Sequence, residues 1–106
     1  MAIQNKSIFN AEVTTVGRKS GLLRTIELRL ICLDQKYFAS SSKVEGKHWC
    51  QNMIKNPEVQ VKAGGKSYKC RARLVTEEPL RLRALHIRDS KPLLERIVFE
   101  LAPIGA

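Results

Sequence analysis

Several features that often mark a function are scarce in this chain of 106 residues. The three cysteines, Cys32, Cys50 and Cys70, are odd in number and show no Cys-x-x-Cys or His-x-x-x-His spacing. Neither a disulfide framework nor a zinc site is therefore predicted. No run approaches the roughly 20 apolar residues of a membrane helix, and the opening "MAIQNKSIFN" lacks the apolar core of a signal peptide. We therefore expect a cytoplasmic protein with reduced thiols.

Acidic residues are also few, with 10 Asp and Glu against 19 Lys and Arg, which gives a formal net charge of +9. Such a surplus favours an anionic partner: a phosphate, a carboxylate, nucleic acid or an acidic membrane surface. Aromatic residues make up only 6% of the chain, which leaves few rings for stacking on nucleic-acid bases. The length and the 43% hydrophobic content fit one globular domain over residues 1–106.

Alternation of apolar and polar residues predicts strands more readily than helices. Glycines at 64 and 65 predict a tight hairpin turn, because glycine adopts positive φ without strain. The strands are expected over residues 11–16, 25–33, 37–41, the two arms of 59–75, and 97–104.

Two short helices complete the predicted set. One is expected over 48–57, where Asn56-Pro57 ends it, and the other over 77–89, where acidic residues and Pro79 precede several arginines. The connections are too short for parallel crossovers, so about six antiparallel strands with two helices predict a mainly β protein, a barrel.

The stretch "TTVGRKSG", Thr14 to Gly21, concentrates charge in the predicted turn between the first two strands. Its glycines allow the backbone to bend closely around an anion, while its cations, hydroxyl and main-chain N–H groups can bind one. Its residue order is not that of a Walker loop. The alternative is a solvated turn whose cations aid solubility. The residues of this predicted anion cradle are Gly17, Arg18, Lys19, Ser20, Gly21 and, just beyond, Arg24.

A second group of polar residues follows the third predicted strand. "SSSK" (40–43) leaves that strand and "GKHW" (46–49) enters the first helix, so hydroxyls, a lysine and an indole gather at a strand end. Trp49 could pack on the ring system of a ligand. The alternative is that Trp49 anchors the core and the serines merely fill the loop.

Taken in order, these motifs resemble the deazaflavin-dependent nitroreductase family. The matching features are Thr-Thr-x-Gly-Arg-Lys-Ser-Gly with a following arginine, a Ser-Lys pair, Trp and Asn ahead of Asn-Pro, a Val-x-Val segment and a glycine hairpin, from about Ala11 to Thr76. The resemblance implies a split β-barrel of the flavin-reductase type. It also implies a homodimer that binds the deazaflavin coenzyme F(420) or, in related branches, FMN, and that uses no metal.

The resemblance implies roles for individual residues as well. The cations, Ser20 and Arg24 would hold the cofactor's phosphate and acidic tail, Ser42 and Lys43 would line its groove, and Trp49 and Asn52 would lie beside its ring system or support that wall. The full set of expected cofactor-binding residues is Thr15, Gly17, Arg18, Lys19, Ser20, Gly21, Arg24, Ser41, Ser42, Lys43, Trp49 and Asn52.

The reaction implied is hydride transfer from the reduced deazaflavin to a small organic acceptor such as a nitro compound or a quinone. No acid–base pair is visible in the sequence. His48, next to Trp49, is the candidate proton donor because a histidine can change charge near neutral pH. The alternative is a surface histidine at a helix start.

Departures from the family pattern leave two other functions open. Cys50 stands where the family typically has a tyrosine, the loop before Trp49 is shorter than usual, and a tyrosine-rich segment near the C-terminus is missing. One alternative is a carrier that binds flavin or deazaflavin without catalysis. The other is a basic barrel that binds nucleic acid through the cationic strand face of Lys69, Arg71 and Arg73. Four further arginines extend this charge: Arg81, Arg83, Arg88 and Arg96.

Overall fold

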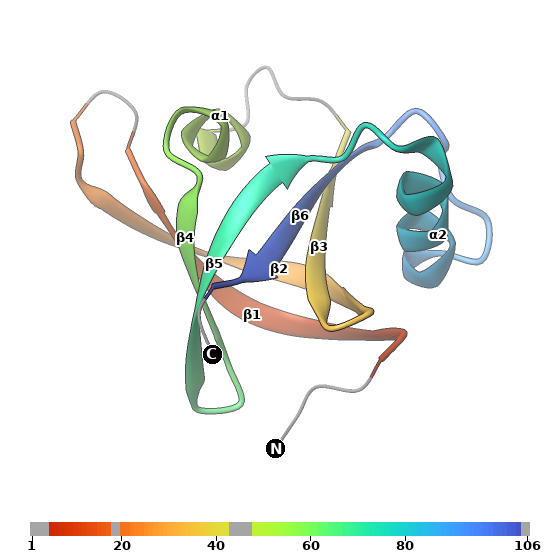
Figure 1. The fold of residues 1–106 in the computed structure, drawn as a ribbon, viewed down its shortest axis with the longest axis horizontal. Coiled ribbons are helices and arrows are strands. Elements are labelled where there is room, and N and C mark those ends of the chain that lie inside the picture. Colours follow the sequence, from red (N-terminus) through yellow and green to blue (C-terminus); the bar gives the residue numbers. More distant parts are fainter. Residues whose placement is uncertain (1–4, 18–19, 43–47, 105–106) are drawn as a thin grey trace.

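Six antiparallel strands close into a barrel, and two helices pack against it (Figure 1). The computed structural model describes residues 5–17, 20–42 and 48–104. The strand order around the barrel is β1-β2-β3-β6-β5-β4. This confirms the predicted mainly β barrel with two helices. The elements are β1 (Ser7–Val16), β2 (Leu23–Leu33), β3 (Lys36–Ser41), α1 (His48–Lys55), β4 (Glu58–Ala63), β5 (Lys66–Leu74), α2 (Glu78–Arg88) and β6 (Ile97–Pro103).

The strands alternate as the sequence pattern predicts, with one set of side chains inside the barrel. Val13, Leu30, Val61 and Leu101 are each 0% exposed, and burying a side chain of this size contributes about 1.5–3 kcal/mol. Cys70 is also fully buried in this core. β1 begins at Ser7, four residues before the predicted start, because its first residues pair with the end of β2 although they are partly exposed.

The two helices cover different parts of the barrel. Cys50 and Met53 of α1 join the core cluster inside the strands, so α1 closes one end of the barrel (Figure 1). Leu85 of α2 packs instead on a second cluster, formed by outward side chains such as Ile31 and Phe38. This explains why β2 ends in an unbroken buried run, since both of its faces are covered there. Neither helix among the described residues has the length and apolar character to cross a membrane.

The barrel is split at one side because β2 pairs with β3 over only three residue pairs, beginning at Ile31 and Phe38. By contrast, β1 and β2 pair along the whole of β1, from Ser7 to Val16. β1 also leaves β4 after Thr14. The end of β1 and the start of β2 therefore form a two-stranded arm, residues 15–16 and 23–24, which projects from the barrel (Figure 1).

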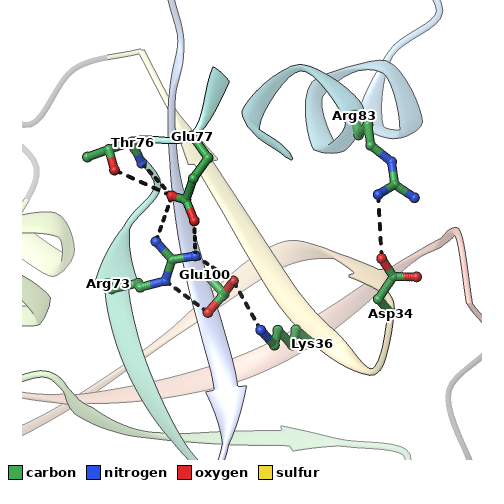
Figure 2. A network of polar contacts seen from close by, with 7 residues as sticks. All are labelled: Asp34, Lys36, Arg73, Thr76, Glu77, Arg83 and Glu100. Carbon is green, nitrogen blue, oxygen red and sulfur yellow. Dashed lines mark hydrogen bonds and ion pairs between the residues drawn. The ribbon is translucent and has the colours of Figure 1, made fainter. Parts of the chain in front are cut away.

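A charged network ties β3, β5 and β6 together on the outer surface (Figure 2). Arg73 donates to the Oε1 and Oε2 atoms of Glu100 at 3.1 and 3.0 Å, and to both carboxylate oxygens of Glu77 at 2.8 and 2.9 Å. Lys36 approaches Glu100 at 3.7 Å. Glu100 is only 4% exposed, so its carboxylate depends on these cations. The hydrogen bonds from Arg73 lower the pKa of Glu77 to about 2.

We expect this ion pair to make stability depend on pH. The pKa of Glu77 in the folded protein, about 2, is below its ordinary value of 4.5. The contribution is therefore complete above pH 4.5 and is lost as the pH falls towards 2. In urea unfolding, Glu77→Gln should be less stable than the wild type at neutral pH, and the difference should shrink over that range.

The matched control for this prediction is Glu95→Gln, which removes an exposed carboxylate that forms no ion pair with the described residues. It should leave the unfolding free energy unchanged. Added salt should weaken the effect of Glu77→Gln, because the pair is exposed and screened. A difference from the wild type that stays constant down to pH 2 would contradict the assignment.

Candidate functional site

Three hydrogen bonds close the β1–β2 loop at its base. The N–H of Gly17 donates to the carbonyl oxygen of Leu22 at 2.7 Å, and the N–H of Gly21 donates to the carbonyl oxygen of Gly17 at 2.9 Å. The N–H of Leu22 donates to Ser20 Oγ at 3.2 Å. The loop's ends are therefore fixed relative to each other. Arg18 and Lys19 lie outside the described residues.

The two glycines of this loop are required for different reasons. A Cβ atom at Gly17 would lie 2.9 Å from Ser20 Oγ and 3.1 Å from the carbonyl oxygen of Leu22, so a side chain would fill the inside of the loop. Gly21 has φ +72°, in the left-handed region that favours glycine. The described part of the loop is thus a narrow, closed turn, and the N–H groups of Gly17, Gly21 and Leu22 all donate within it.

Two side chains, one in helix α1 and one directly after it, donate hydrogen bonds to the β1 strand of the arm. Asn52 Nδ2 donates to Thr15 Oγ1 at 3.2 Å, and Asn56 Nδ2 donates to the carbonyl oxygen of Val16 at 3.3 Å. Thr15 is 1% and Asn52 4% exposed. The two asparagines therefore tie the last two residues of β1, Thr15 and Val16, to α1. Arg24, by contrast, is exposed on β2 directly opposite Thr15, at the base of the loop.

The remaining predicted residues gather around the end of β3 and the start of α1. Trp49 is half-buried and packs edge-on against Phe99, with ring centroids 5.9 Å apart. It therefore anchors the core and keeps part of its ring exposed. Ser41 is buried at the end of β3, whereas Ser42 and His48 are exposed. Lys43 lies outside the described residues.

One polar contact near this end was not predicted from the sequence. Arg96, just before β6, donates through Nε to Ser40 Oγ at 2.7 Å. Burial lowers the pKa of Arg96, and the charge of Arg88 lowers it further. Arg96 is one arginine among many in a basic segment, and no local pattern distinguishes it, so only the fold brings it to Ser40.

A hollow of about 350 Å³ on the outer side of the barrel was also missed. Its apolar side chains are Val16, Leu23 and Ile104, and its polar ones include Gln60 and Lys69. None of the predicted cofactor-binding residues lines it. Its walls come from β1, β2, β4, β5 and the residue after β6, so no short stretch of sequence indicates it.

Some arginines of the alternative nucleic-acid surface are already bound to carboxylates and are not free to contact phosphates. Arg73 is bound by Glu77 and Glu100, and Arg81 donates to both carboxylate oxygens of Glu78 at 2.7 and 2.8 Å. These pairs neutralise part of the cationic face, which weakens the case for a phosphate-tracking surface. In the part of the chain that the structure describes, no group of three or more His, Cys, Asp or Glu side chains could hold a metal ion.

The closed barrel of six antiparallel strands matches several solved structures. The structure is similar to a putative pyridoxamine 5'-phosphate oxidase from Listeria innocua, with TM-score 0.71, 13% identity and coverage of 91% of this chain and 84% of that one. At this identity the similarity shows the fold alone.

Two other solved structures are more similar in sequence. An F(420)H(2)-dependent reductase has TM-score 0.64 and 25% identity, and the alignment covers 95% of this chain and 98% of that one. A protein described as a domain-swapped dimer has TM-score 0.65 and 26% identity, with coverage of 94% and 83%.

Residues 6–93 match the model of the F(420)H(2)-dependent quinone reductase family, and the chain belongs to this family. The membership confirms the resemblance inferred from the motifs and the expected cofactor, F(420). Comparison with curated proteins found no match.

We expect the bond between Asn52 and Thr15 to stabilise the base of the loop. Asn52→Ala removes the donor to a buried hydroxyl, a loss that costs about 1–3 kcal/mol of unfolding free energy. In a double-mutant cycle with Thr15→Val, urea unfolding should show a coupling of about 0.5–1.5 kcal/mol.

The control cycle uses Thr14→Val and Thr25→Val, whose hydroxyl oxygens lie 2.8 Å apart on the exposed face of the same strands. Its coupling should be close to zero, since water replaces the lost bond. Additive effects at Asn52 and Thr15 would show that the buried bond does not hold the arm.

Proposed function

We propose that this protein is an oxidoreductase that uses reduced F(420) to transfer a hydride to a small organic acceptor, a quinone or a nitro compound. The observation that carries the proposal is the β1–β2 loop, a glycine cradle closed by its own hydrogen bonds and supported by α1. Membership of the F(420)H(2)-dependent quinone reductase family supports the cofactor and the reaction. FMN is the alternative cofactor.

The donors of the loop fit the anionic part of this cofactor. Ser20 Oγ accepts the N–H of Leu22, and its own hydrogen remains able to donate to a phosphate oxygen. Arg24 stands exposed at the base of the same loop, where it can bind a phosphate or carboxylate through two N–H groups. By sequence, Arg18 and Lys19 add two further cations between the two glycines. A phosphodiester with an acidic tail requires such a set.

When bound, F(420) supplies the hydride chemistry, and the chain's residues bind and orient it. We assign the exposed part of Trp49, with Ser42, to the wall of the groove that holds the ring system, and the buried Ser41 supports this wall from inside. Asn52 and Thr15 fix the loop rather than contact the ring, because both are buried. His48, exposed at the start of α1, is the candidate group that gives a proton to the acceptor.

We expect Arg18→Ala with Lys19→Ala to weaken F(420) binding by at least tenfold, because charge-assisted hydrogen bonds are worth roughly 1.5–3 kcal/mol each. Quenching of deazaflavin fluorescence measures the affinity, and a parallel titration with FMN decides between the two cofactors. The control, Lys62→Ala with Lys66→Ala, removes two cations from the β4–β5 hairpin at the opposite end of the barrel (Figure 1). It should leave the affinity unchanged.

Turnover separates an enzyme from a carrier. Reduced F(420) should be oxidised when a quinone or a nitro compound is added to the wild type, and the loop variant should need a higher cofactor concentration. Tight binding without oxidation of the cofactor would identify a carrier. A wild type that binds neither F(420) nor FMN would exclude this function altogether.

We further propose that the protein is a cytoplasmic homodimer. No disulfide joins Cys32, Cys50 and Cys70, which supports a reducing compartment. Leu23 is 71% and Ile104 49% exposed, and both border the outer hollow. Exposed apolar side chains around a hollow favour a protein–protein contact. One similar structure is a domain-swapped dimer.

We expect sedimentation of the wild type to report twice the mass of one chain. Leu23→Glu should shift the protein towards the monomer, because it places a charge in the proposed contact. Leu93→Glu is the matched control, since Leu93 is 61% exposed and lies between α2 and β6, away from the hollow. A monomeric wild type, or a dimer that survives Leu23→Glu, would contradict the proposed contact.

A further inference from the structure

Arg96 is held in a fixed position beside the end of β3. Its Nε atom donates to Ser40 Oγ at 2.7 Å. The ladder between β3 and β6 ends at the pair Ser41 and Ile97. One step beyond that pair stand Ser42 and Arg96, so the arginine lies at the strand end where the exposed serine leaves the sheet.

The main chain at Arg96 is fixed by helix α2. Nη1 of Arg81 donates to the carbonyl oxygens of Leu94 and Arg96 at 2.6 and 2.7 Å. Arg81 is itself oriented by Glu78, whose carboxylate accepts hydrogen bonds from the Nε and Nη2 atoms of Arg81. The N–H of Arg96 donates to the carbonyl oxygen of Leu93 at 3.3 Å. Backbone and side chain are therefore positioned by separate sets of bonds.

Arg96 differs from nearby arginines because it forms no ion pair with a described carboxylate. Arg73, Arg81 and Arg88 each form an ion pair with a carboxylate. No carboxylate of the described residues lies within ion-pair distance of Arg96, which is partly buried. Burial lowers the pKa of this positioned cation, although the charge of Asp89 acts on it from a longer distance and raises its pKa. A cation without an ion-pair partner is an exception of the kind expected at functional sites.

We propose that Arg96, positioned by Ser40, is the binding residue of a second anion subsite at the end of β3, which takes a carboxylate or phosphate group of a small molecule. The bond to Ser40 uses Nε, so Nη1 and Nη2 present a fork that matches two oxygens of such a group. The exposed hydroxyl of Ser42 stands one step beyond the ladder, next to Arg96.

This subsite is separate from the β1–β2 loop. β2 starts beside the loop at Leu23 and meets β3 only at Ile31, opposite Phe38. Ser40 is therefore removed from the loop by roughly six residue steps of strand, or about 20 Å at about 3.3 Å per step. One compact anion cannot contact both places. The second anion belongs either to a distant part of the cofactor or to the acceptor, so the inference rests on the proposed function.

The test compares Arg96→Gln with Arg83→Gln. The control also removes one positive charge, but Arg83 is in α2 and pairs with Asp34 at the opposite end of β3 (Figure 2). Two affinities are measured: one for F(420), and one for the deazaflavin chromophore without its phosphodiester tail. Two KM values are measured, for a quinone that carries a carboxylate and for its uncharged ester.

If the anion is on the cofactor, Arg96→Gln raises the Kd of F(420) at least tenfold and leaves that of the tail-less chromophore unchanged. If it is on the acceptor, the variant raises the KM of the carboxylated quinone at least tenfold and leaves that of the ester unchanged. In either case Arg96→Lys restores part of the loss, because the charge returns without the fork. Ser40→Ala gives an intermediate loss, because it releases the guanidinium.

The proposal is overturned if Arg96→Gln changes neither charged ligand more than Arg83→Gln does, or if it affects charged and uncharged ligands equally. Thermal unfolding of every variant is compared with the wild type, and Arg96→Lys carries the test if Arg96→Gln does not fold. Failure of the wild type to bind F(420) and FMN rejects the proposed function instead. Titration with inorganic phosphate then tests the subsite alone: weaker binding to Arg96→Gln than to Arg83→Gln supports it, and equal binding overturns it.

Discussion

The early end of the ladder between β2 and β3, at Ile31 and Phe38, is the constraint on which the rest of the structure depends. Beyond this pair β2 remains bonded to β1 alone, so the two strands continue as an arm. A strand edge that leaves a sheet exposes main-chain groups that need partners. On the other edge of the arm β1 leaves β4 after Thr14, and there Asn56, the residue after α1, donates to the carbonyl oxygen of Val16. The end of α1 therefore supports the arm on the edge that β4 has left.

β3 has a different partner where it parts from β2. β3 leaves β2 and pairs instead with β6, down to Ser41 and Ile97. Trp49 packs on Phe99, which is a residue of β6. α1 and the residue after it thus contact the arm through two asparagines, and α1 contacts β6 through Trp49. α2 packs on the outer surface of β2, where Ile31 is 1% exposed.

The distribution of paired charges distinguishes the basic residues that stabilise the fold from those available to a ligand. Arg73 connects β5 to the buried Glu100, and Arg81 connects α2 to the segment before β6. These arginines have carboxylates of their own. Arg24 and Arg96 form no ion pair with a described carboxylate; Arg24 stands at the base of the β1–β2 loop and Arg96 beside the end of β3. Ion pairs therefore neutralise part of the positive charge locally, and the net charge of +9 comes from residues outside these pairs.

Local patterns determined much of what the sequence could reveal. The alternation along β2 and β5 sets which side chains are inside, and the positive φ values of Gly64 and Gly65, +58° and +78°, follow from the glycines themselves. The motif from Thr14 to Gly21 contributed to the prediction of the family, because such a motif depends on neighbouring residues.

The tertiary structure alone decided which distant faces meet. Asn52 bonds to Thr15 across 37 positions, and Arg96 bonds to Ser40 across 56. No local pattern could predict these contacts, because they depend on the strand order and on where β2 and β3 part. A sequence specifies turns and faces through near neighbours, whereas a site that joins two strand ends exists only once the barrel has closed.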